Sequence, residues 1–217
     1  MSNRLLTIVL LVGLGYTTLA LAPRLTAWRL PGDQQGYEPV QPIAFSHRVH
    51  AGDLQMACLY CHSGAERSRR AGIPPANVCM NCHKFVTAPP GAVRAEDERA
   101  QQEKRKPRRV VSPELAKLYA ALALDDRGER DPARMPTPVA WMKVHNLPDF
   151  AYFDHRSHVR AGVMCQTCHG PVETMERVRQ VATLSMGWCV NCHRTSTAQG
   201  VAGRPVNAST DCVTCHY

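Results

Sequence analysis

The ten cysteines of this 217-residue chain fall into five pairs, and a histidine directly follows each pair in the pattern C-x-x-C-H. Two thiols three positions apart can form thioethers with both vinyl groups at one edge of a porphyrin, and the next histidine then presents a nitrogen to the iron. The pattern therefore predicts five covalently attached c-type haems. The motif residues are Cys58, Cys61 and His62; Cys79, Cys82 and His83; Cys165, Cys168 and His169; Cys189, Cys192 and His193; and Cys212, Cys215 and His216.

Paired cysteines also occur in zinc ribbons, in redox-active C-x-x-C sites and in disulfides. A zinc ribbon does not need a histidine after every pair, and redox-active pairs seldom recur five times in one chain. All ten cysteines are used by the motifs and none is left over. Haem attachment is therefore the favoured interpretation.

Five histidines lie outside the motifs, which equals the number of predicted haems. An imidazole is a good second axial ligand and gives a six-coordinate, low-spin iron with no position open to substrate. We therefore predict iron ligation by these residues and no catalytic residue in the chain. They are His47, His50, His145, His155 and His158. Met186, three residues before Cys189, is the alternative ligand, and a thioether there would raise the potential of one haem.

The positions of the distal histidines suggest a hypothesis for which haem each one serves. We expect His47 to serve the haem at Cys58, and His155 the haem at Cys165. His145 would reach the haem at Cys79. His50 and His158 would be shared between the haems at Cys189 and Cys212.

The chain contains an internal repeat. The sequence F-x-H-R-x-H occurs at Phe45–His50 and again at Phe153–His158, each time shortly before a haem motif. Each half then carries a second motif, C-x-N-C-H, followed by a basic residue. This predicts two-haem modules at about 45–90 and 145–200, an insertion at 85–140, and a fifth haem motif at 212–216.

The sequence shows little of the pattern typical of β-strands. We expect a mainly irregular fold with short α-helices, a multihaem cytochrome c fold packed around five haems, plus one N-terminal transmembrane helix. Aromatic residues make up only 6% of the chain, so the haems should form most of the apolar interior. Without haem the domain should not fold.

The insertion holds two recognisable segments. Residues 95–106 are a charge run, for which a solvated helix or loop is expected. Ser112 and Pro113 then favour a helix start, as N-cap and first helical residue. This helix should end near Gly128, with its apolar face facing the core. The face consists of Leu115, Leu118, Tyr119, Leu122 and Leu124.

Residues Leu5 to Ala22 are uncharged, with Arg4 and Arg24 at the flanks. This run is near the roughly 20 residues that cross a bilayer as a helix. A cleaved signal peptide is the alternative, but Pro23 would follow the cut. We therefore expect a membrane anchor at 1–23, an extended linker at 24–44 and the pentahaem domain at 45–217. The chain would be a single-pass protein of the cytoplasmic membrane with the haem domain on the periplasmic, outer face, where haem is attached.

The formal net charge is +8. A basic chain can bind nucleic acid, but the propionates of five haems could cancel this excess. Charge therefore identifies no partner, and no nucleic acid is expected.

Two longer stretches are more distinctive than the motifs. One runs from Trp141 (WMKVHNLPDFAYF) through the Cys165 motif, and the other is LSMGWCVNCHR, residues 184–194. With FSHRVH and five haem motifs, they resemble the pentahaem cytochrome subunit of alternative complex III, a class III-like multihaem cytochrome c family. The resemblance covers nearly the whole chain beyond the expected anchor.

This resemblance implies a respiratory or photosynthetic complex that oxidises menaquinol and passes electrons to a periplasmic acceptor. Its partners would be an iron–sulfur, molybdopterin-like subunit, polytopic quinol-binding membrane subunits and other cytochrome c subunits. The chain alone would not be an enzyme. One alternative is a stand-alone, membrane-anchored quinol dehydrogenase that feeds a periplasmic reductase. A haem reductase acting on nitrite or a sulfur compound would need an open iron, and the equal ligand counts argue against it.

Overall fold

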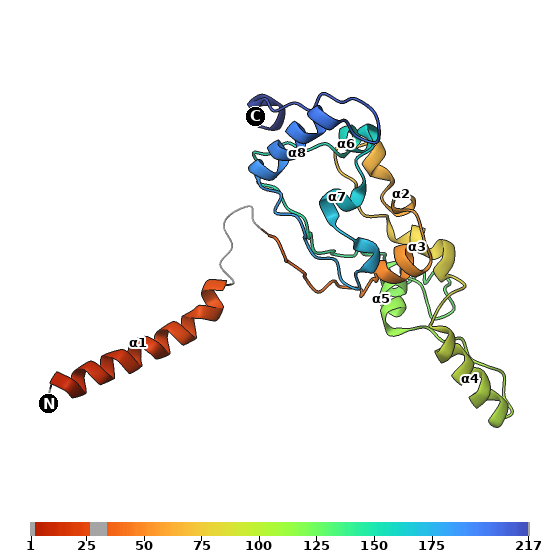
Figure 1. Cartoon of the computed structure of the whole chain (residues 1–217). Coiled ribbons are helices and arrows are strands. Elements are labelled where there is room, and N and C mark those ends of the chain that lie inside the picture. The colour runs from red at the N-terminus through yellow and green to blue at the C-terminus, as the bar shows by residue number, and fades with distance from the viewer. Residues whose placement is uncertain (1–2, 27–33, 217) are drawn as a thin grey trace.

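The structure, a computed structural model, describes residues 3–26 and 34–216, without the side chains of residues 3 and 21–26. The chain is built from short helices and irregular connections (Figure 1). The α-helices are α1 (Asn3–Thr26), α2 (Cys58–Cys61), α3 (Ala76–His83), α4 (Pro90–Gln102), α5 (Pro113–Ala121), α6 (His155–Ala161), α7 (Cys165–His169), α8 (Met186–Gln199) and α9 (Cys212–Cys215). A π-helical turn, η1 (Arg48–Asp53), and two 3₁₀ turns, η2 (Ser63–Glu66) and η3 (Val172–Thr174), complete the set.

Strand pairing in the described part of the chain is limited to isolated bridges, one of which joins Ala151 to His216. This matches the weak strand pattern of the sequence. Each C-x-x-C pair lies within a helix, namely α2, α3, α7, α8 or α9. Residues three apart share one face of a helix, so both thiols of each motif project to the same side.

Helix α5 begins as the sequence predicts. The Ser112 hydroxyl accepts a hydrogen bond from the Leu115 amide at 3.4 Å, and Pro113 is the first helical residue. Leu118 and Tyr119 are buried. The helix ends at Ala121 rather than near Gly128, and Ala123 just beyond it has a left-handed backbone with φ of 54°. That conformation cannot continue a right-handed helix.

The charge run of the insertion is largely helical and only partly solvated. It lies mostly in α4, which projects from one end of the body in Figure 1. Glu96 is only 8% exposed. Its carboxylate accepts hydrogen bonds from the Arg105 guanidinium at 2.5 Å and from the Arg108 amide at 2.9 Å. The returning segment is thereby fastened against the helix.

The N-terminal expectation requires a correction. No helix in the part of the chain that the structure describes is both long and apolar enough to span a bilayer. This contradicts the expected single-pass anchor at 1–23 and the location on the outer face of the cytoplasmic membrane. Part of the expected linker, residues 27–33, lies outside the described residues.

The apolar core is thin. Among the described residues the buried apolar ones are mostly alanines, namely Ala65, Ala88, Ala100 and Ala123, together with Leu118, Tyr119 and Met175. The chain exposes 15784 Å², whereas a folded monomer of 24.0 kDa typically exposes about 9,900 Å². The detached helix α1 accounts for part of this excess (Figure 1). The protein alone supplies little apolar interior for a stable fold.

Candidate haem-binding sites

Two histidine pairs face each other with parallel rings. The ring centroids of His47 and His62 are 6.4 Å apart with planes 3° from parallel, and those of His155 and His169 are also 6.4 Å apart, at 4°. A bond between a metal and an imidazole nitrogen is about 2 Å long, so rings on opposite sides of one metal have centres roughly 6 Å apart. Each pair therefore has the spacing of two axial ligands.

Two further pairs repeat this spacing with other ring angles. His50 and His83 have centroids 6.0 Å apart at 62°, and His158 and His193 have centroids 6.0 Å apart at 37°. The structure thus places His50 at the Cys79 motif, not near the Cys189 or Cys212 motif as expected. His158 lies at the Cys189 motif, one of its two expected places. Each F-x-H-R-x-H segment faces the two motifs of its own module.

The phenyl ring at the start of each repeat positions both of its histidines. Phe45 meets His47 edge-on at 4.9 Å and stacks on His50 at 4.3 Å. Phe153 meets His155 edge-on at 4.8 Å and lies 4.5 Å from His158. We did not predict this role for Phe45 and Phe153, although the repetition of phenylalanine in the pattern was a signal for it.

Hydrogen bonds fix the orientation of most of these rings. An imidazole that donates from Nδ1 keeps its lone pair on Nε2, the arrangement that metal-binding histidines commonly have. Seven rings direct Nδ1 to a backbone carbonyl oxygen at 2.5–3.3 Å. The pairs of ring and carbonyl are His50 with Ser46, His62 with Gly72, His83 with Val86, His155 with Arg69, His158 with Asp154, His193 with Ser209, and His216 with Phe150.

The electrostatic environment keeps several of these rings neutral. Burial lowers the pKa of His47 to about 4, with a smaller contribution from His62. Burial and the neighbouring His145 lower the pKa of His169 to about 4 as well. The pKa of His158 is also lowered, mainly by burial. These rings are therefore neutral at pH 7, which is the form that binds a metal.

The cysteines are available for haem attachment, since all ten are free thiols. Large apolar side chains next to the motifs are exposed, among them Met164 at 68% and Val213 at 86%. In the described residues, no three side chains of His, Cys, Asp or Glu gather as they would around a bare metal ion. Free thiol pairs, exposed apolar side chains and opposed imidazoles fit a haem at the first four motifs.

Electrostatic contacts between thiols show which motifs are neighbours. Burial raises the pKa of Cys79, Cys165, Cys168 and Cys189, and in each case a thiol of another motif adds to the shift. The neighbouring pairs are Cys79 with Cys61, Cys165 with Cys58, Cys168 with Cys192, and Cys189 with Cys215. The motifs therefore form a row that begins at Cys79, continues through Cys58, Cys165 and Cys189, and ends at Cys212. The motif helices follow the same order through the body in Figure 1.

The two modules meet at Arg69. Its carbonyl oxygen accepts hydrogen bonds from the backbone amide of His155 at 3.2 Å and from the ring Nδ1 at 2.9 Å. Its side chain donates to the Phe153 carbonyl at 3.2 Å and covers the ring of Tyr152 at 4.3 Å. The first module thus orients a histidine of the second.

The insertion also supports one motif. The hydroxyl of Tyr119 in α5 donates to the carbonyl oxygen of His83 at 2.6 Å, and Arg109 donates to the neighbouring Lys84 carbonyl at 2.9 Å. This role of Tyr119 was not predicted beyond its place on the apolar helix face.

His145 and Met186 do not occupy comparable ligand positions. His145 was expected at the Cys79 motif, but its Nε2 lies 3.2 Å from Nδ1 of His169, with ring centroids 4.3 Å apart at 84°. Met186 is the first residue of α8 and is 69% exposed. His158 already faces the motif histidine of that helix, His193.

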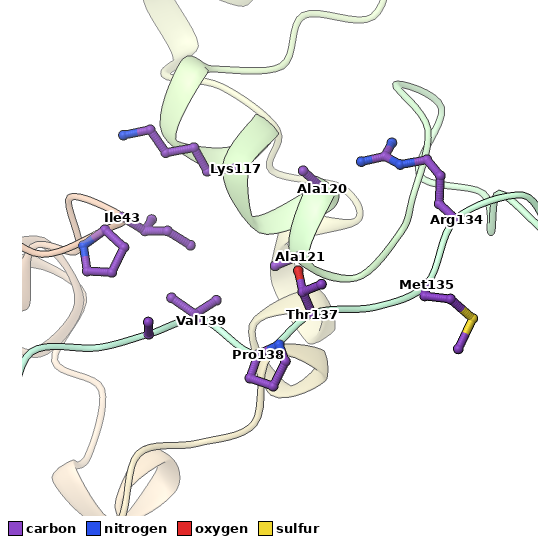
Figure 2. Close-up of a pocket in the computed structure, with 11 residues that line it drawn as sticks. Ile43, Lys117, Ala120, Ala121, Arg134, Met135, Thr137, Pro138 and Val139 are labelled. Carbon is purple, nitrogen blue, oxygen red and sulfur yellow. The ribbon is translucent and has the colours of Figure 1, made fainter.

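A separate open hollow of about 510 Å³ lies between α5, the segment around Ile43 and the segment 134–140 (Figure 2). Figure 2 shows Ile43 and Val139 on facing segments, with Ala120 and Ala121 of α5 beside them. None of its lining residues is a cysteine or a histidine. It is not part of the row of motifs.

Comparison with known proteins supports the chemistry deduced from the site. Residues 151–217 match the family model described as cytochrome c7 and related cytochrome c. This part of the chain is therefore similar to multihaem cytochromes c, which carry covalently bound haem. The chain is also 26% identical over 196 residues to the protein named menaquinone reductase, multihaem cytochrome c subunit, of Nitratidesulfovibrio vulgaris; the match covers 81% of this chain and 76% of that protein. Both likenesses indicate electron transfer by a multihaem cytochrome c.

Proposed function

We propose that this chain is the electron-transfer subunit of a menaquinone-linked redox complex and that it holds five c-type haems in a row. The observation that carries the proposal is the set of four opposed imidazole pairs, each made by one motif histidine and one other histidine. Bound haem supplies an iron that gains and loses one electron. The relative from Nitratidesulfovibrio vulgaris supports the link to menaquinone.

The chain's own residues would provide attachment, orientation and spacing. The paired cysteines would hold each porphyrin by its edge, and the opposed imidazoles would fill both axial positions at the first four motifs. Carbonyl groups on Nδ1 would keep the rings in one tautomer and raise their basicity. The row of motifs from Cys79 to Cys212 gives the electron two ends at which partners can dock.

The finer proposal is a menaquinol-oxidising complex of the alternative complex III type, with the partner subunits that the resemblance implies. The opposite direction is a second candidate, because the relative is named a menaquinone reductase. A row of haems carries electrons either way, and the relative potentials of the partners set the direction. A stand-alone quinol dehydrogenase is the third candidate.

The first test is the covalent mass. The tagged full-length chain is made in a host that attaches c-type haem, denatured to strip non-covalent cofactors, and weighed. We expect the chain mass plus five haems. A mass equal to the bare chain contradicts the whole proposal.

The second test concerns partners and direction. The tagged chain is purified from a cell that carries its native partners, and the co-purifying proteins are identified. The preparation is then either mixed in its oxidised form with menadiol, or first reduced, freed of excess reductant and mixed with oxidised menadione, while haem absorbance is followed. Haem reduction by menadiol that requires the partners supports quinol oxidation. Reduction by the chain alone supports the stand-alone dehydrogenase instead.

A further inference from the structure

We infer that His145 is a positioning residue that acts on the haem at Cys165 through His169, and that the iron at the Cys212 motif has no second imidazole from this chain. The inference rests on the proposed function, since it assumes haem at these motifs. It replaces the expectation that five spare histidines serve five irons. The equal counts conceal two different roles.

The geometry at His169 separates it from the other motif histidines. His62, His83, His193 and His216 each direct Nδ1 to a backbone carbonyl. His169 directs Nδ1 to the imidazole Nε2 of His145, at 3.2 Å. Because a histidine that binds iron through Nε2 carries its proton on Nδ1, His169 donates and His145 accepts.

The same contact removes His145 from the set of free ligands. Its Nε2 is the atom that would bind a metal, and this atom is engaged with His169. The second face of the His169 site already belongs to His155, whose ring lies parallel at 6.4 Å. His145 therefore lies behind the motif histidine, on the side away from the metal position.

The loop that carries His145 is fastened to a distant segment. The side chain of Gln41 accepts a hydrogen bond from the Met142 amide at 2.9 Å and donates to the Met142 carbonyl at 3.0 Å. Within the loop, the Lys143 ammonium donates a hydrogen bond to the side-chain oxygen of Asn146 at 2.7 Å. These contacts hold the loop in the position that brings His145 to His169.

The remaining imidazoles are all assigned. All ten histidines lie in the described part of the chain, and four of the five outside the motifs face His62, His83, His169 and His193. Among the described residues, the aromatic ring that contacts His216 is that of Phe150, with ring centroids 5.8 Å apart. The Cys212 motif is thus the one without an opposed histidine.

A stronger acceptor on Nδ1 makes the other ring nitrogen a better electron donor to a metal. Such a donor favours the oxidised iron. An imidazole acceptor in place of a carbonyl should therefore lower the potential of the haem held by His169. Removal of the imidazole in His145→Ala should raise that potential, whereas the side-chain amide oxygen introduced by His145→Gln can still accept the hydrogen bond.

The first experiment compares wild type, His145→Ala and His145→Gln as purified haem-loaded full-length chains. Redox titration and electron paramagnetic resonance are recorded for each. We expect His145→Ala to raise the midpoint potential of one low-spin haem without adding a high-spin signal, and His145→Gln to restore most of the wild-type value. A new high-spin haem in His145→Ala would show that His145 is a ligand and overturn the inference. Unchanged potentials in all three would overturn it too.

The second experiment reads the hydrogen bond directly. In a His155→Ala background the haem at His169 loses its distal ligand, so the iron–histidine band that this variant gains over wild type in resonance Raman of the reduced protein reports the bond between iron and His169. We expect that stretching band to move to lower frequency when His145→Ala is added and to stay in place with His145→Gln. A band that does not respond when His145→Ala is added contradicts the positioning role. This outcome decides the question even if the single variant His145→Ala of the first experiment folds poorly.

The third experiment tests the Cys212 site. Wild type should show one haem that differs from the four bis-imidazole haems and binds added cyanide fastest. The double change Cys212→Ser and Cys215→Ser should remove that haem alone. Five equivalent bis-imidazole haems would overturn this part. A denatured chain whose mass shows no attached haem would instead contradict the proposed function. Failure of the proposed function and failure of this inference therefore give different results.

Discussion

The imidazole rings of His155 and His169 lie parallel, 6.4 Å between centroids, on either side of the position where a haem iron would be held. We expect His155→Ala to keep the covalent haem at Cys165 and Cys168 but to open one axial position. The sample should gain one high-spin ferric haem in electron paramagnetic resonance, and the haem content by mass should stay unchanged. Ser157→Ala, an exposed change in the same helix α6, is the matched control and should leave the spectrum as it is. A spectrum in which every haem signal matches wild type would show that His155 is not a ligand.

Phe153 contacts two imidazoles of different sites, His155 and His158, at 4.8 and 4.5 Å. Phe153→Ala should therefore shift the potentials of two haems at once while both remain attached. Contacts between aromatic rings are worth about 0.5–1.5 kcal/mol each, so we expect a loss of about 1–3 kcal/mol in unfolding free energy. Redox titration and denaturant unfolding measure the two effects. Phe85→Ala, at a 76% exposed ring, should produce neither. A shift of a single haem would refute the shared role.

Gly52 lies where η1 presses against η3. A Cβ built there collides with the backbone carbonyl oxygen of Glu173, which cannot move aside as a flexible side chain could. Overpacking of this kind costs about 1–3 kcal/mol, so Gly52→Ala should lower the unfolding midpoint and disturb the haem served by His50. Gly91→Ala is the control, because nothing lies within 4 Å of its added Cβ in helix α4. That change should be neutral or stabilising by up to about 1 kcal/mol. Equal behaviour of the two variants would contradict the close approach.

The sequence predicted the chemistry better than the arrangement. Motif spacing is local, so the paired thiols and the histidine that follows each pair could be identified from the pattern, and Ser112 with Pro113 was sufficient to predict the start of α5. We predicted the wrong motif for His50 because the sequence does not show that the chain between His50 and His83 folds back and brings the two rings together. The contact between His145 and His169 depends on the anchoring of a loop to Gln41, which no short pattern encodes. Glu96 was read as solvated, since its partner Arg105 approaches only after the chain reverses.

Glu96 predicts a pH dependence of the insertion. Hydrogen bonds from Arg105 and the Arg108 amide lower its pKa from 4.5 to about 2. A depressed carboxyl pKa means that the charged form stabilises the fold, fully above the unfolded pKa and less as pH falls toward the folded one. The stabilisation should therefore be present at pH 7 and fade between about pH 4.5 and 2. Glu96→Gln should weaken amide hydrogen-exchange protection of residues 90–108 at pH 7, after correction for intrinsic rates.

The difference between wild type and Glu96→Gln should shrink as the pH falls below 4.5, because protonation removes the same charge that the substitution removes. Glu98→Gln on the exposed face of α4 is the control, and it should change protection little at any pH. A Glu96→Gln effect that stays constant from pH 7 to pH 3 would mean that packing of the side chain, and not its charge, holds the returning segment against the helix.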